Sequence, residues 1–470
     1  MTAMSETPRK PWYAFATPAL GKGVRWASRI TRHGGSAFPG KVIETTDPGF
    51  LARTLGRLPL GTVLVSGTNG KTTTTRMVAS MLETLGLRVF TNPTGSNFTR
   101  GVVSALLDQV DLAGRLDADI AVLELDEAYA VHFVEQVRPR HALLLNVMRD
   151  QLDRFGEIDN TARLLGKVAA HTDGTVVLNR EDPRIAALAQ EAPAGTAVSW
   201  FGLSAPLRRF FPTDDEMTAA ALDLAAGAVA VPEDGRPDAD VLLTEVGDHH
   251  ARLLVDGEEH ATDVKLEGVY NLYNAAAALA VVRAVQQDVR ATLETRRPRG
   301  AFADRVTRFA GAGTDELIGA LAQVTPAFGR GEVIDLDGTP VELLLVKNPM
   351  GFRLSLGSFP PDGCDTMICI NDEYADGRDM SWLWDVDFTS LRETGVQAVS
   401  GVRAWDMALR LSYDDVPVGD VSTDLAAAVR AFVTADPGRT KHIYCTYTAM
   451  LAVRAQLATM TDVADAGVGK

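Results

Sequence analysis

The sequence has little cysteine. Its 470 residues contain three, Cys364, Cys369 and Cys445, which are too few and too scattered for a disulfide framework or a four-thiolate zinc site. All three lie in strand-like runs rather than in a turn suited to a nucleophile. We therefore expect buried, unreactive thiols.

The sequence also lacks long apolar runs and an excess of basic charge. No stretch approaches the ~18 apolar residues that span a bilayer, and the N-terminus has no apolar signal core followed by a cleavage site. We therefore expect a cytoplasmic protein. The formal charge of −15 argues against nucleic-acid binding, because phosphate backbones require a basic surface.

Basic residues do gather ahead of Glu44, where Glu6 is the only acid. The seven basic residues there are Arg9, Lys10, Lys22, Arg25, Arg29, Arg32 and Lys41. Such a segment can make peripheral contact with an anionic membrane, where each Lys or Arg contributes about 1 kcal/mol. It can equally form a helix that packs on the next domain with its charges in water, and the sequence leaves both options open.

The length predicts two domains, since single cores stop growing at roughly 250–300 residues. Runs such as TVLVSG, DIAVLEL and HALLLNV alternate with helical patterns, which is typical of an α/β fold with a parallel sheet covered on both faces. The stretch VLLTEVGDHHARLLVDGEEHATDVKL alternates in polarity and predicts a small antiparallel meander. The expected units are a basic N-terminal segment 1–55, a middle domain 56–295 and, after the linker ETRRPRG, a second Rossmann-like α/β domain 300–470.

The stretch SGTNGKTTTTRM, Ser66–Met77, joins a strand to a helix through a glycine-rich turn. Backbone N–H groups there can converge on phosphate oxygens, and the helix N-terminus adds its dipole. Lys71 would pair with the β- and γ-phosphates, and the Thr72 hydroxyl would join a Mg²⁺ shell. The candidate nucleotide-binding residues of this loop are Thr68, Asn69, Gly70, Lys71, Thr72 and Thr73. Because Val65 stands where the generic loop has a glycine, a turn that merely caps a helix is the alternative.

The form GTNGKTTT resembles the phosphate loop of the Mur ligase family, whose members use ATP to join amines to carboxylates. VLELDE is similar to the family's next segment and implies that Glu124 binds Mg²⁺. GVYNLYNAAAAL resembles the family's Asn-x-x-Asn helix, which implies that Asn271 and Asn274 contact adenine, with Tyr270 in place of the more usual histidine. Taken singly, Glu124 could be a solvated strand end and the two asparagines helix-surface residues.

The segment NVMRDQLDRFG is also similar to one of that family, in the same order along the chain. The matching residues are Asn146, Asp150, Asp153 and Arg154. Gln151 stands where many members have a metal-binding histidine, so the sequence leaves the family's second metal site open.

The C-terminal half of the sequence narrows the resemblance from the whole Mur ligase family to one of its subfamilies. The stretch NDEYADGRDMSWLWDVDF, residues 371–388, is similar to the signature of the MurT subfamily, the ligase subunits of lipid II isoglutaminyl synthases, as are RHGGSAFPGKV, VKNPMGF and TYTAML. Only about 55 residues precede the phosphate loop, too few for the UDP-sugar domain of the peptide-forming Mur ligases. The resemblance implies ATP-dependent amidation of the D-glutamate α-carboxyl of the lipid II stem peptide through an acyl phosphate.

The same resemblance implies roles for residues of the second half. Lys347 matches the lysine that reaches the γ-phosphate, although an exposed strand-end lysine is the alternative. Arg305 lies near the family's interdomain arginine. Ammonia would come from a GatD glutaminase subunit, forming a heterodimer with this chain.

An acidic loop is expected to serve that partner. A Cys–His glutaminase works better when a carboxylate orients its histidine, and the resemblance gives that role to Asp372, with Asp376 and Asp379 as rivals. Solvated acids are the structural alternative. The nearby Trp382 and Trp384 suit a protein interface.

The sequence departs from the subfamily in one respect. Members often carry a four-cysteine zinc ribbon in the middle domain, and its place would be WFGLSAPLRRFFPTDDEM, residues 200–217, which has no cysteine. We therefore expect no zinc, with packing contacts in its place. His249 and His250 lie in a predicted turn and are expected to be solvated.

Two other functions remain open. The first is an amino-acid ligase of the muropeptide or folylpolyglutamate type. The second is an ATP-binding subunit without catalysis of its own. Gln151, which stands in place of the metal-binding histidine, is the reason why this alternative remains open.

Overall fold

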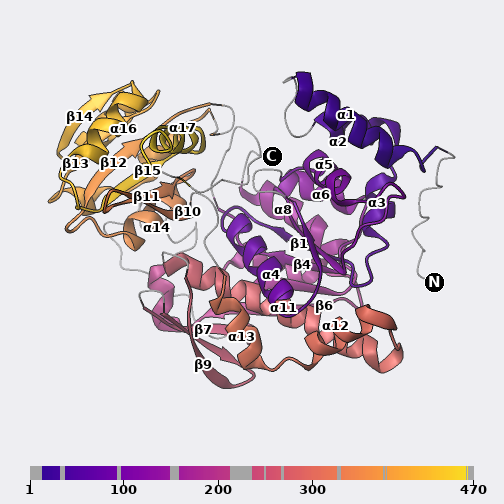
Figure 1. Cartoon of the computed structure of the whole chain (residues 1–470). Coiled ribbons are helices and arrows are strands. Elements are labelled where there is room, and N and C mark those ends of the chain that lie inside the picture. Colours follow the sequence, from indigo (N-terminus) through magenta and orange to yellow (C-terminus); the bar gives the residue numbers. More distant parts are fainter. Residues whose placement is uncertain are drawn as a thin grey trace.

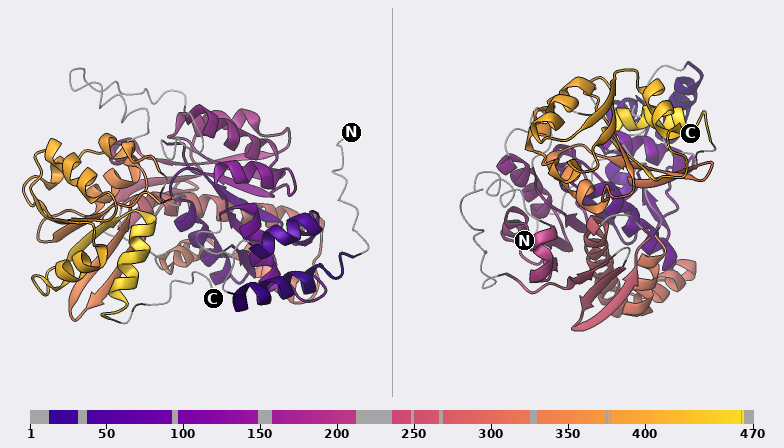
Figure 2. Two further views of the ribbon diagram at one scale, coloured as in Figure 1. Left: turned by 90° about the horizontal axis from the view of Figure 1, so that it is seen from above. Right: turned by 90° about the vertical axis from the view of Figure 1, so that its left-hand side faces the viewer.

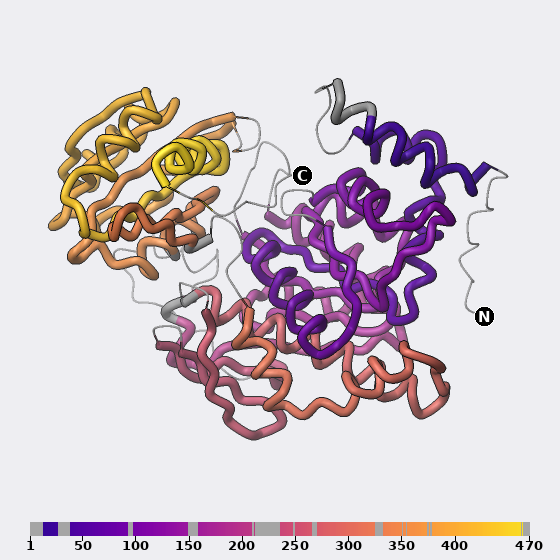
Figure 3. The backbone as a smooth tube through the Cα atoms, in the orientation of Figure 1, coloured from indigo at the N-terminus to yellow at the C-terminus, as the bar shows by residue number. Residues whose placement is uncertain are grey.

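The computed structural model of the chain describes residues 13–31, 38–92, 97–148, 158–211, 236–247, 250–265, 269–324, 330–373, 376, 378–461 and 463. Two α/β bodies lie side by side (Figure 1 and Figure 2). Figure 3 follows the chain from the indigo N-terminal helices through the magenta first body to the yellow second body. The expected α/β class with two domains is confirmed.

The first body is built on a nine-stranded sheet in the order β2-β3-β1-β4-β5-β6-β7-β8-β9. The strand pairs from β2 to β7 are parallel, and β7, β8 and β9 form the predicted antiparallel meander. The strands are β1 Thr62–Ser66, β2 Val89–Thr91, β3 Ile120–Glu124, β4 His141–Leu144, β5 Thr175–Asn179, β6 Ala197–Leu203, β7 Val241–Val246, β8 His250–Val255 and β9 Glu258–Asp263. The central strands β1, β3 and β4 are buried along their whole length, because helices cover both faces of the sheet.

One face of this sheet is covered by α4 and the long α11, and the other by α3, α5, α6, α8 and α9 (Figure 1). The helices of the first body and of the preceding segment are α1 Thr17–Thr31, α2 Phe38–Thr46, α3 Phe50–Leu55, α4 Lys71–Thr84, α5 Thr99–Gln109, α6 Glu127–Val134, α8 Ile158–Ala170, α9 Pro183–Ala187, α11 Val269–Thr295, α12 Gly300–Gly311 and α13 Thr314–Ala322. Short 3-10 turns, η1 Leu188–Glu191 and η2 Ala205–Phe210, follow α9 and β6. In the part of the chain that the structure describes, no helix is both long and apolar enough to cross a bilayer.

The first body extends beyond the expected boundary at residue 300. Helices α12 and α13 follow the charged linker and pack on α11 and α4. Phe309, Leu317 and Leu321 are buried in the same core cluster as Met77 and Leu82 of α4. The second body therefore begins with β10, about thirty residues later than the sequence suggested.

The second body has a six-stranded sheet in the order β10-β11-β15-β12-β13-β14, parallel except for the hairpin β10–β11. Helices α14 and α15 cover one face, and α16 and α17 the other. The strands are β10 Arg330–Leu336, β11 Thr339–Leu345, β12 Asp365–Cys369, β13 Val396–Ser400, β14 Val418–Ser422 and β15 Lys441–Cys445. The helices are α14 Pro349–Ser358, α15 Ala404–Tyr413, α16 Leu425–Thr434 and α17 Tyr447–Leu457, with 3-10 turns η3 Ser381–Asp385 and η4 Thr389–Leu391.

The N-terminal helices α1 and α2 pack on α5 of the first body. The Gly40 N–H donates to Ser104 Oγ at 2.9 Å, and a Cβ on Gly40 would lie 2.0 Å from the carbonyl oxygen of Arg100. Arg25 forms an ion pair with Asp108 of α5. The described part of the basic segment is thus a pair of helices packed on the middle domain, while Arg9, Lys10 and Arg32 lie outside the described residues.

Candidate active site

The phosphate loop lies at the point where the strand order of the first sheet reverses. Strand β1 sits between β3 and β4, and open α/β sheets bind ligands at the carboxyl ends of strands at such a point. Gly67 and Gly70 have φ of +132° and +85°, and a Cβ on Gly70 would lie 2.5 Å from Asn274 Oδ1. The loop therefore depends on glycine for both its backbone and its closeness to α11.

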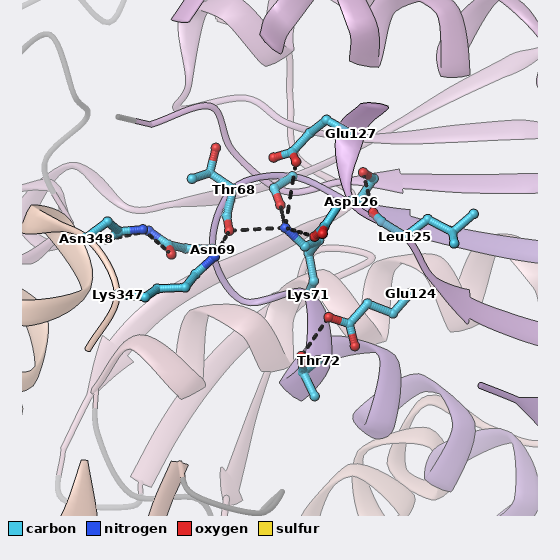
Figure 4. A network of polar contacts seen from close by, with 12 residues as sticks. Thr68, Asn69, Lys71, Thr72, Glu124, Leu125, Asp126, Glu127, Lys347 and Asn348 are labelled. Carbon is cyan, nitrogen blue, oxygen red and sulfur yellow. Dashed lines mark hydrogen bonds and ion pairs between the residues drawn. The ribbon is translucent and has the colours of Figure 1, made fainter. Parts of the chain in front are cut away.

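Lys71, the first residue of α4, is buried and surrounded by acceptors. Its Nζ donates to the Gly67 carbonyl at 2.6 Å and lies 3.1 Å from Asp126 Oδ1 and 3.9 Å from Glu127 Oε2 (Figure 4). The sequence reasoning missed both acids, although they follow Glu124 in the same quoted segment, VLELDE. A buried ammonium in a loop of converging N–H groups is suited to bind phosphate oxygens.

Thr72 and Glu124 are brought together as expected. Thr72 Oγ1 donates to Glu124 Oε1 at 2.7 Å, and the backbone of Glu124 exchanges two hydrogen bonds with the side chain of Asn92, at 2.9 and 3.0 Å. A hydroxyl beside a carboxylate is a hard oxygen donor pair that fits Mg²⁺, which usually keeps waters and substrate phosphates as its other ligands. Among the described residues no group of three or more His, Cys, Asp or Glu could hold a metal ion, so such an ion would depend on those other oxygens.

The second body reaches the loop through the end of β11. Lys347 Nζ donates to the Thr68 carbonyl at 3.2 Å. Asn348 Nδ2 donates to Asn69 Oδ1 at 2.9 Å, and Asn69 Nδ2 returns a longer bond of 3.4 Å (Figure 4). Asn348 Oδ1 also accepts the Gly351 N–H at 2.7 Å and so caps α14. The structure thus brings Lys347 to the loop as expected, and Asn348 is an additional contact that the sequence reasoning did not single out.

The end of β4 supports the loop from the other side. The Asn69 N–H donates to Asn146 Oδ1 at 2.8 Å, and Asn146 Nδ2 donates to the Asn69 carbonyl at 3.0 Å. The Met148 N–H donates to Thr68 Oγ1 at 3.0 Å. The other expected residues of this segment, Asp150, Gln151, Asp153 and Arg154, lie outside the described residues.

The two asparagines of α11 lie beside the loop. Asn274 is buried against Gly70, and its Nδ2 donates to Asn271 Oδ1 at 3.2 Å. Thr73, in the first turn of α4, is also buried. Tyr270 instead packs against Phe211, with ring centroids 5.8 Å apart, and burial raises its pKa. The structure therefore places Asn274 directly against the glycine turn of the phosphate loop, with Asn271 as its hydrogen-bond partner.

Arg305 is not brought to this site. Its Nε and a terminal nitrogen each donate to Asp119 at 2.7 Å, and that ion pair raises the pKa of Arg305. Asp119 precedes the first residue of β3, at the opposite end of the strand from Glu124. In this structure Arg305 therefore fastens α12 to the amino edge of the sheet.

The three candidate acids of the second body occupy different environments. Asp372 Oδ2 accepts from Nε and a terminal nitrogen of Arg403, at 2.9 and 2.7 Å. Asp376 is 2% exposed and accepts from the Thr448 hydroxyl and N–H, and burial raises its pKa. Asp379 is exposed, and a hydrogen bond from Ser381 lowers its pKa. The hydrogen bonds of Asp376 thus hold the acidic loop against Thr448. Asp372 instead lies at the surface of this loop, with 21% of its side chain exposed.

The cysteines form no nucleophilic site. Cys369 and Cys445 are buried in neighbouring strands as expected, and burial raises the pKa of Cys445. The expectation was wrong for Cys364, which lies in the turn after Gly363 rather than in a strand. Burial raises the pKa of Cys364 as well, so its thiolate is disfavoured.

A charged cluster stands near the place expected for a zinc ribbon. Glu181, which is buried, accepts from Arg180 at 2.8 Å, Arg208 at 3.1 Å and Arg236 at 2.6 Å. Arg208 and Arg236 lie on either side of residues 212–235, which are outside the described residues. His250 begins β8 rather than lying in a turn, with Nδ1 3.0 Å from Asp263, and His249 is outside the described residues. The two ends of the segment are therefore joined by an ion-pair cluster rather than by apolar packing alone.

Comparisons with known proteins match this arrangement of two domains. Residues 65–282 match the family model of the Mur ligase middle domain, and residues 345–450 match that of the MurT ligase C-terminal domain. Subunit MurT of the glutamine-hydrolyzing lipid II isoglutaminyl synthase of Streptococcus pneumoniae is 29% identical over 92% of this chain and 94% of that protein. The subunit of the same name from Staphylococcus aureus is 26% identical over 85% of this chain and 87% of that protein.

Solved structures share the fold at lower identity. MurF from Acinetobacter baumannii superimposes with a TM-score of 0.61 at 16% identity, covering 88% of this chain and 79% of that one. MurF ligase from Thermotoga maritima in complex with ADP gives a TM-score of 0.61 at 17% identity, covering 90% and 83%. At these identities the likeness concerns the fold alone.

Proposed function

Because this chain is an ATP-dependent ligase of the Mur family with a MurT-type C-terminal domain, we propose that it amidates the D-glutamate α-carboxyl of the lipid II stem peptide to D-isoglutamine. The observation that carries the proposal is the meeting of Lys71 and Lys347, from the two bodies, at the carbonyl of Thr68. Two ammonium groups on one loop are suited to neutralise the charge that moves during phosphoryl transfer.

The proposed reaction has two steps. A carboxylate oxygen of the substrate attacks the γ-phosphorus of ATP, the bond from that phosphorus to the β–γ bridging oxygen breaks, and ADP leaves. Ammonia then attacks the carbonyl carbon of the acyl phosphate, inorganic phosphate leaves with the electron pair of the C–O bond, and the proton that the nitrogen loses is taken up by that phosphate. Activation is necessary because hydroxide is a very poor leaving group from a carboxylate.

The residues of the site take the following parts in this proposal. Backbone N–H groups of the phosphate loop, Thr68 to Thr73, hold the phosphates, and the amides of Asn271 and Asn274 contact the adenine ring. Thr72 and Glu124 would hold Mg²⁺, which supplies positive charge to the phosphate oxygens. Asp119 engages Arg305 at the far edge of the sheet, so we leave Arg305 out of the nucleotide site.

The proposal includes a second subunit. The ammonia would come from a GatD-type glutaminase, with Asp372 as the carboxylate that orients the catalytic histidine of that partner. The complex would work in the cytoplasm at the inner face of the membrane, where lipid II presents its stem peptide, and without zinc or nucleic acid.

The test supplies the purified chain with lipid II, Mg-ATP and ammonium chloride, and in parallel with a GatD-type subunit and glutamine. ADP release matched by conversion of the stem-peptide acid to the amide, read by mass spectrometry, supports the proposal. ATP turnover that requires an added amino acid would instead identify a peptide ligase. Lys71→Ala should abolish turnover while complex formation with the GatD-type subunit persists, and amidation that survives this change would contradict a catalytic role.

A further inference from the structure

Helix α1 exposes large apolar side chains at the edge of the first body. Phe15, in the turn before the helix, is 67% exposed, Leu20 is 46% exposed and Trp26 is 69% exposed. Ala19 and Gly23 are exposed as well, and their spacings of four and three residues place them on the same row of the helix as Trp26. We name Phe15, Leu20 and Trp26 the α1 face.

The other side of α1 packs on the first body, where α1 and α2 lie outside α5 (Figure 1). A Cβ on Gly21 would clash with the side chain of Leu107 of α5, so the two helices are in close contact. The Thr17 hydroxyl donates to Asp47 Oδ2 at 2.6 Å. A helix that packs by one side normally turns polar residues outward. The α1 face is apolar although it takes no part in this packing, which is typical of an interaction site.

The segment that carries the α1 face is strongly basic. Residues 7–43 contain seven basic residues and no acid, in a chain whose total charge is −15. Three of the basic residues, Lys22, Arg25 and Arg29, belong to α1, and Arg25 is offset by its ion pair with Asp108. Helices that combine Trp and Leu with Lys and Arg are typical of the membrane interface. An anionic membrane repels most of this acidic protein and attracts this segment.

Helix α5 connects α1 to the phosphate loop. The Asp126 N–H donates to the carbonyl of Asn97, just before α5, at 3.1 Å, and Asp126 Oδ1 lies 3.1 Å from Lys71 Nζ. Arg25 of α1 donates to the Ser104 carbonyl at 3.4 Å, which is five residues after the start of α5, or roughly 8 Å along its axis. Thus α1 packs on the same helix whose first turn adjoins the candidate active site.

Charge and position together identify the occupant. In the proposed function the substrate carboxyl belongs to a stem peptide whose lipid anchor stays in the bilayer, so the active site must work within reach of the membrane surface. We propose that the α1 face binds an anionic membrane surface, with Phe15 and Trp26 in the interfacial layer and the basic residues of the segment at the lipid headgroups. The inference rests on the proposed function and adds the surface by which the chain approaches its lipid-linked substrate.

The experiment measures membrane binding apart from catalysis. Flotation of the purified chain with vesicles of phosphatidylcholine that contain about 30% phosphatidylglycerol is compared with flotation with pure phosphatidylcholine vesicles. Trp26→Asp and the milder Trp26→Ala are compared with wild type. Trp405→Asp is the matched control, because Trp405 is 66% exposed on α15 of the second body. The Tm of each variant establishes that it is folded.

Wild type should float with the anionic vesicles and not with the neutral ones, and raising the salt to about 0.5 M should weaken this binding. Trp26→Asp is expected to lower the partition coefficient by about tenfold or more, and Trp26→Ala by less. Trp405→Asp should bind as wild type. Wild-type flotation of Trp26→Asp, equal flotation with the two kinds of vesicle, or flotation with neither overturns the inference.

Two further outcomes are told apart by the same set of proteins. A wild-type chain that sediments as a dimer without vesicles, and as a monomer when it carries Trp26→Asp, overturns the inference in favour of self-association. Absence of amidation by wild type with lipid II, Mg-ATP and ammonium chloride counts against the proposed function only, because the flotation uses neither ATP nor lipid II.

Discussion

Asn348 of the second body and Asn69 of the phosphate loop face each other and join their side-chain amides, with Asn348 Nδ2 donating to Asn69 Oδ1 at 2.9 Å. Asn348 is fully buried. Because Asn69 is also held by Asn146 of the first body, this contact ties the conformation of the phosphate loop to the position of the second body.

Asn348→Asp should impair nucleotide use without unfolding the chain. Aspartate caps a helix as well as asparagine does, so α14 keeps its cap. The change nevertheless removes the donor to Asn69 and places negative charge beside the phosphate loop. We expect the KM for ATP to rise by about tenfold or more. Asn348→Ala, which also loses the cap, should lower the Tm further, by an amount that corresponds to about 1 kcal/mol. An unchanged KM in Asn348→Asp would show that the contact is not used.

Gly70→Ala should abolish ATP binding, and Gly338→Ala is its control. Both glycines have nearly the same positive φ, +85° and +84°, so both variants pay a similar backbone cost of roughly 1–2 kcal/mol. Only at Gly70 does the new Cβ meet a neighbour, Asn274 Oδ1 at 2.5 Å, whereas nothing lies within 4 Å at Gly338. Calorimetric titration with Mg-ATP should find binding in Gly338→Ala alone. Equal binding by the two variants would contradict a close fit of α11 to the loop.

Thr72→Val should raise the Mg²⁺ concentration needed for half-maximal turnover by about tenfold or more, because it removes one of the two oxygen donors proposed for the ion. Thr74→Val provides the matched control two residues along the same helix. The Thr74 hydroxyl is buried and has no hydrogen-bond partner among the described residues, so its replacement should be neutral or slightly stabilising. Identical Mg²⁺ titrations of both variants would remove Thr72 from the metal site.

Asp372→Asn should impair amidation that uses glutamine as the nitrogen source and leave amidation that uses ammonium chloride intact. We expect glutamine-dependent amidation to fall by about 10²-fold or more, since an amide cannot stabilise the histidine cation of the partner. Ammonium-dependent amidation should persist. Arg403→Ala should lower the kcat of glutamine hydrolysis because the carboxylate loses the guanidinium that orients it, and Arg403→Lys should restore part of it. An effect of Asp372→Asn on both sources would assign Asp372 a structural role.

Acidification should destabilise the first body through His141. This side chain is fully buried in β4. Burial lowers its pKa below the ordinary value of about 6.5, and the positive charge of Arg140 lowers it as well, whereas Asp288, 3.7 Å from Nε2, acts in the opposite direction. Below pH 6.5 the unfolded chain therefore binds a proton that the folded chain does not. The free energy of unfolding should fall with decreasing pH, by at most about 1.4 kcal/mol per pH unit from this group.

Urea denaturation of wild type and His141→Gln between pH 7 and pH 5 measures this slope. The variant should be less dependent on pH even if its stability is lower throughout. Equal slopes would assign the acid sensitivity to other groups.

The parts of the site that the sequence predicted are those fixed by local geometry. A strand, a glycine turn and a helix place Lys71 and Thr72 with little help from elsewhere, and parallel strands bring Glu124 to the same sheet edge. The partners of these residues were not predictable in the same way. Asp126 faces Lys71, and Asn348 faces Asn69, only once strand register and the arrangement of the two bodies are known.

Two predictions from the sequence, the domain boundary near residue 300 and the place of Arg305, were wrong for reasons that are equally local. The linker ETRRPRG carries proline, glycine and charge, which are typical of a domain boundary, but the helix that follows presents Val306 and Phe309 to the core of the first body. Arg305 precedes them on the same helix and turns to Asp119. By its position in the sequence Arg305 resembles the interdomain arginine of the family. In the structure the packing of α12 on the first body instead directs its side chain to Asp119.

The register of the second sheet has a mechanical consequence. Leu345 at the end of β11 and Cys369 at the end of β12 are both level with Cys445 of the strand between them, so the two strand ends lie roughly 10 Å apart on one rigid edge. One end continues into Asn348 and the other into Asp372. Any hinge rotation that draws Asn348 away from the phosphate loop must therefore carry Asp372, and a subunit bound to it, through the same angle. A glutaminase bound at Asp372 would therefore move together with Asn348 as one rigid body. A change in the distance between Asn348 and the phosphate loop would then change the position of the ammonia source directly, without a chain of side-chain rearrangements.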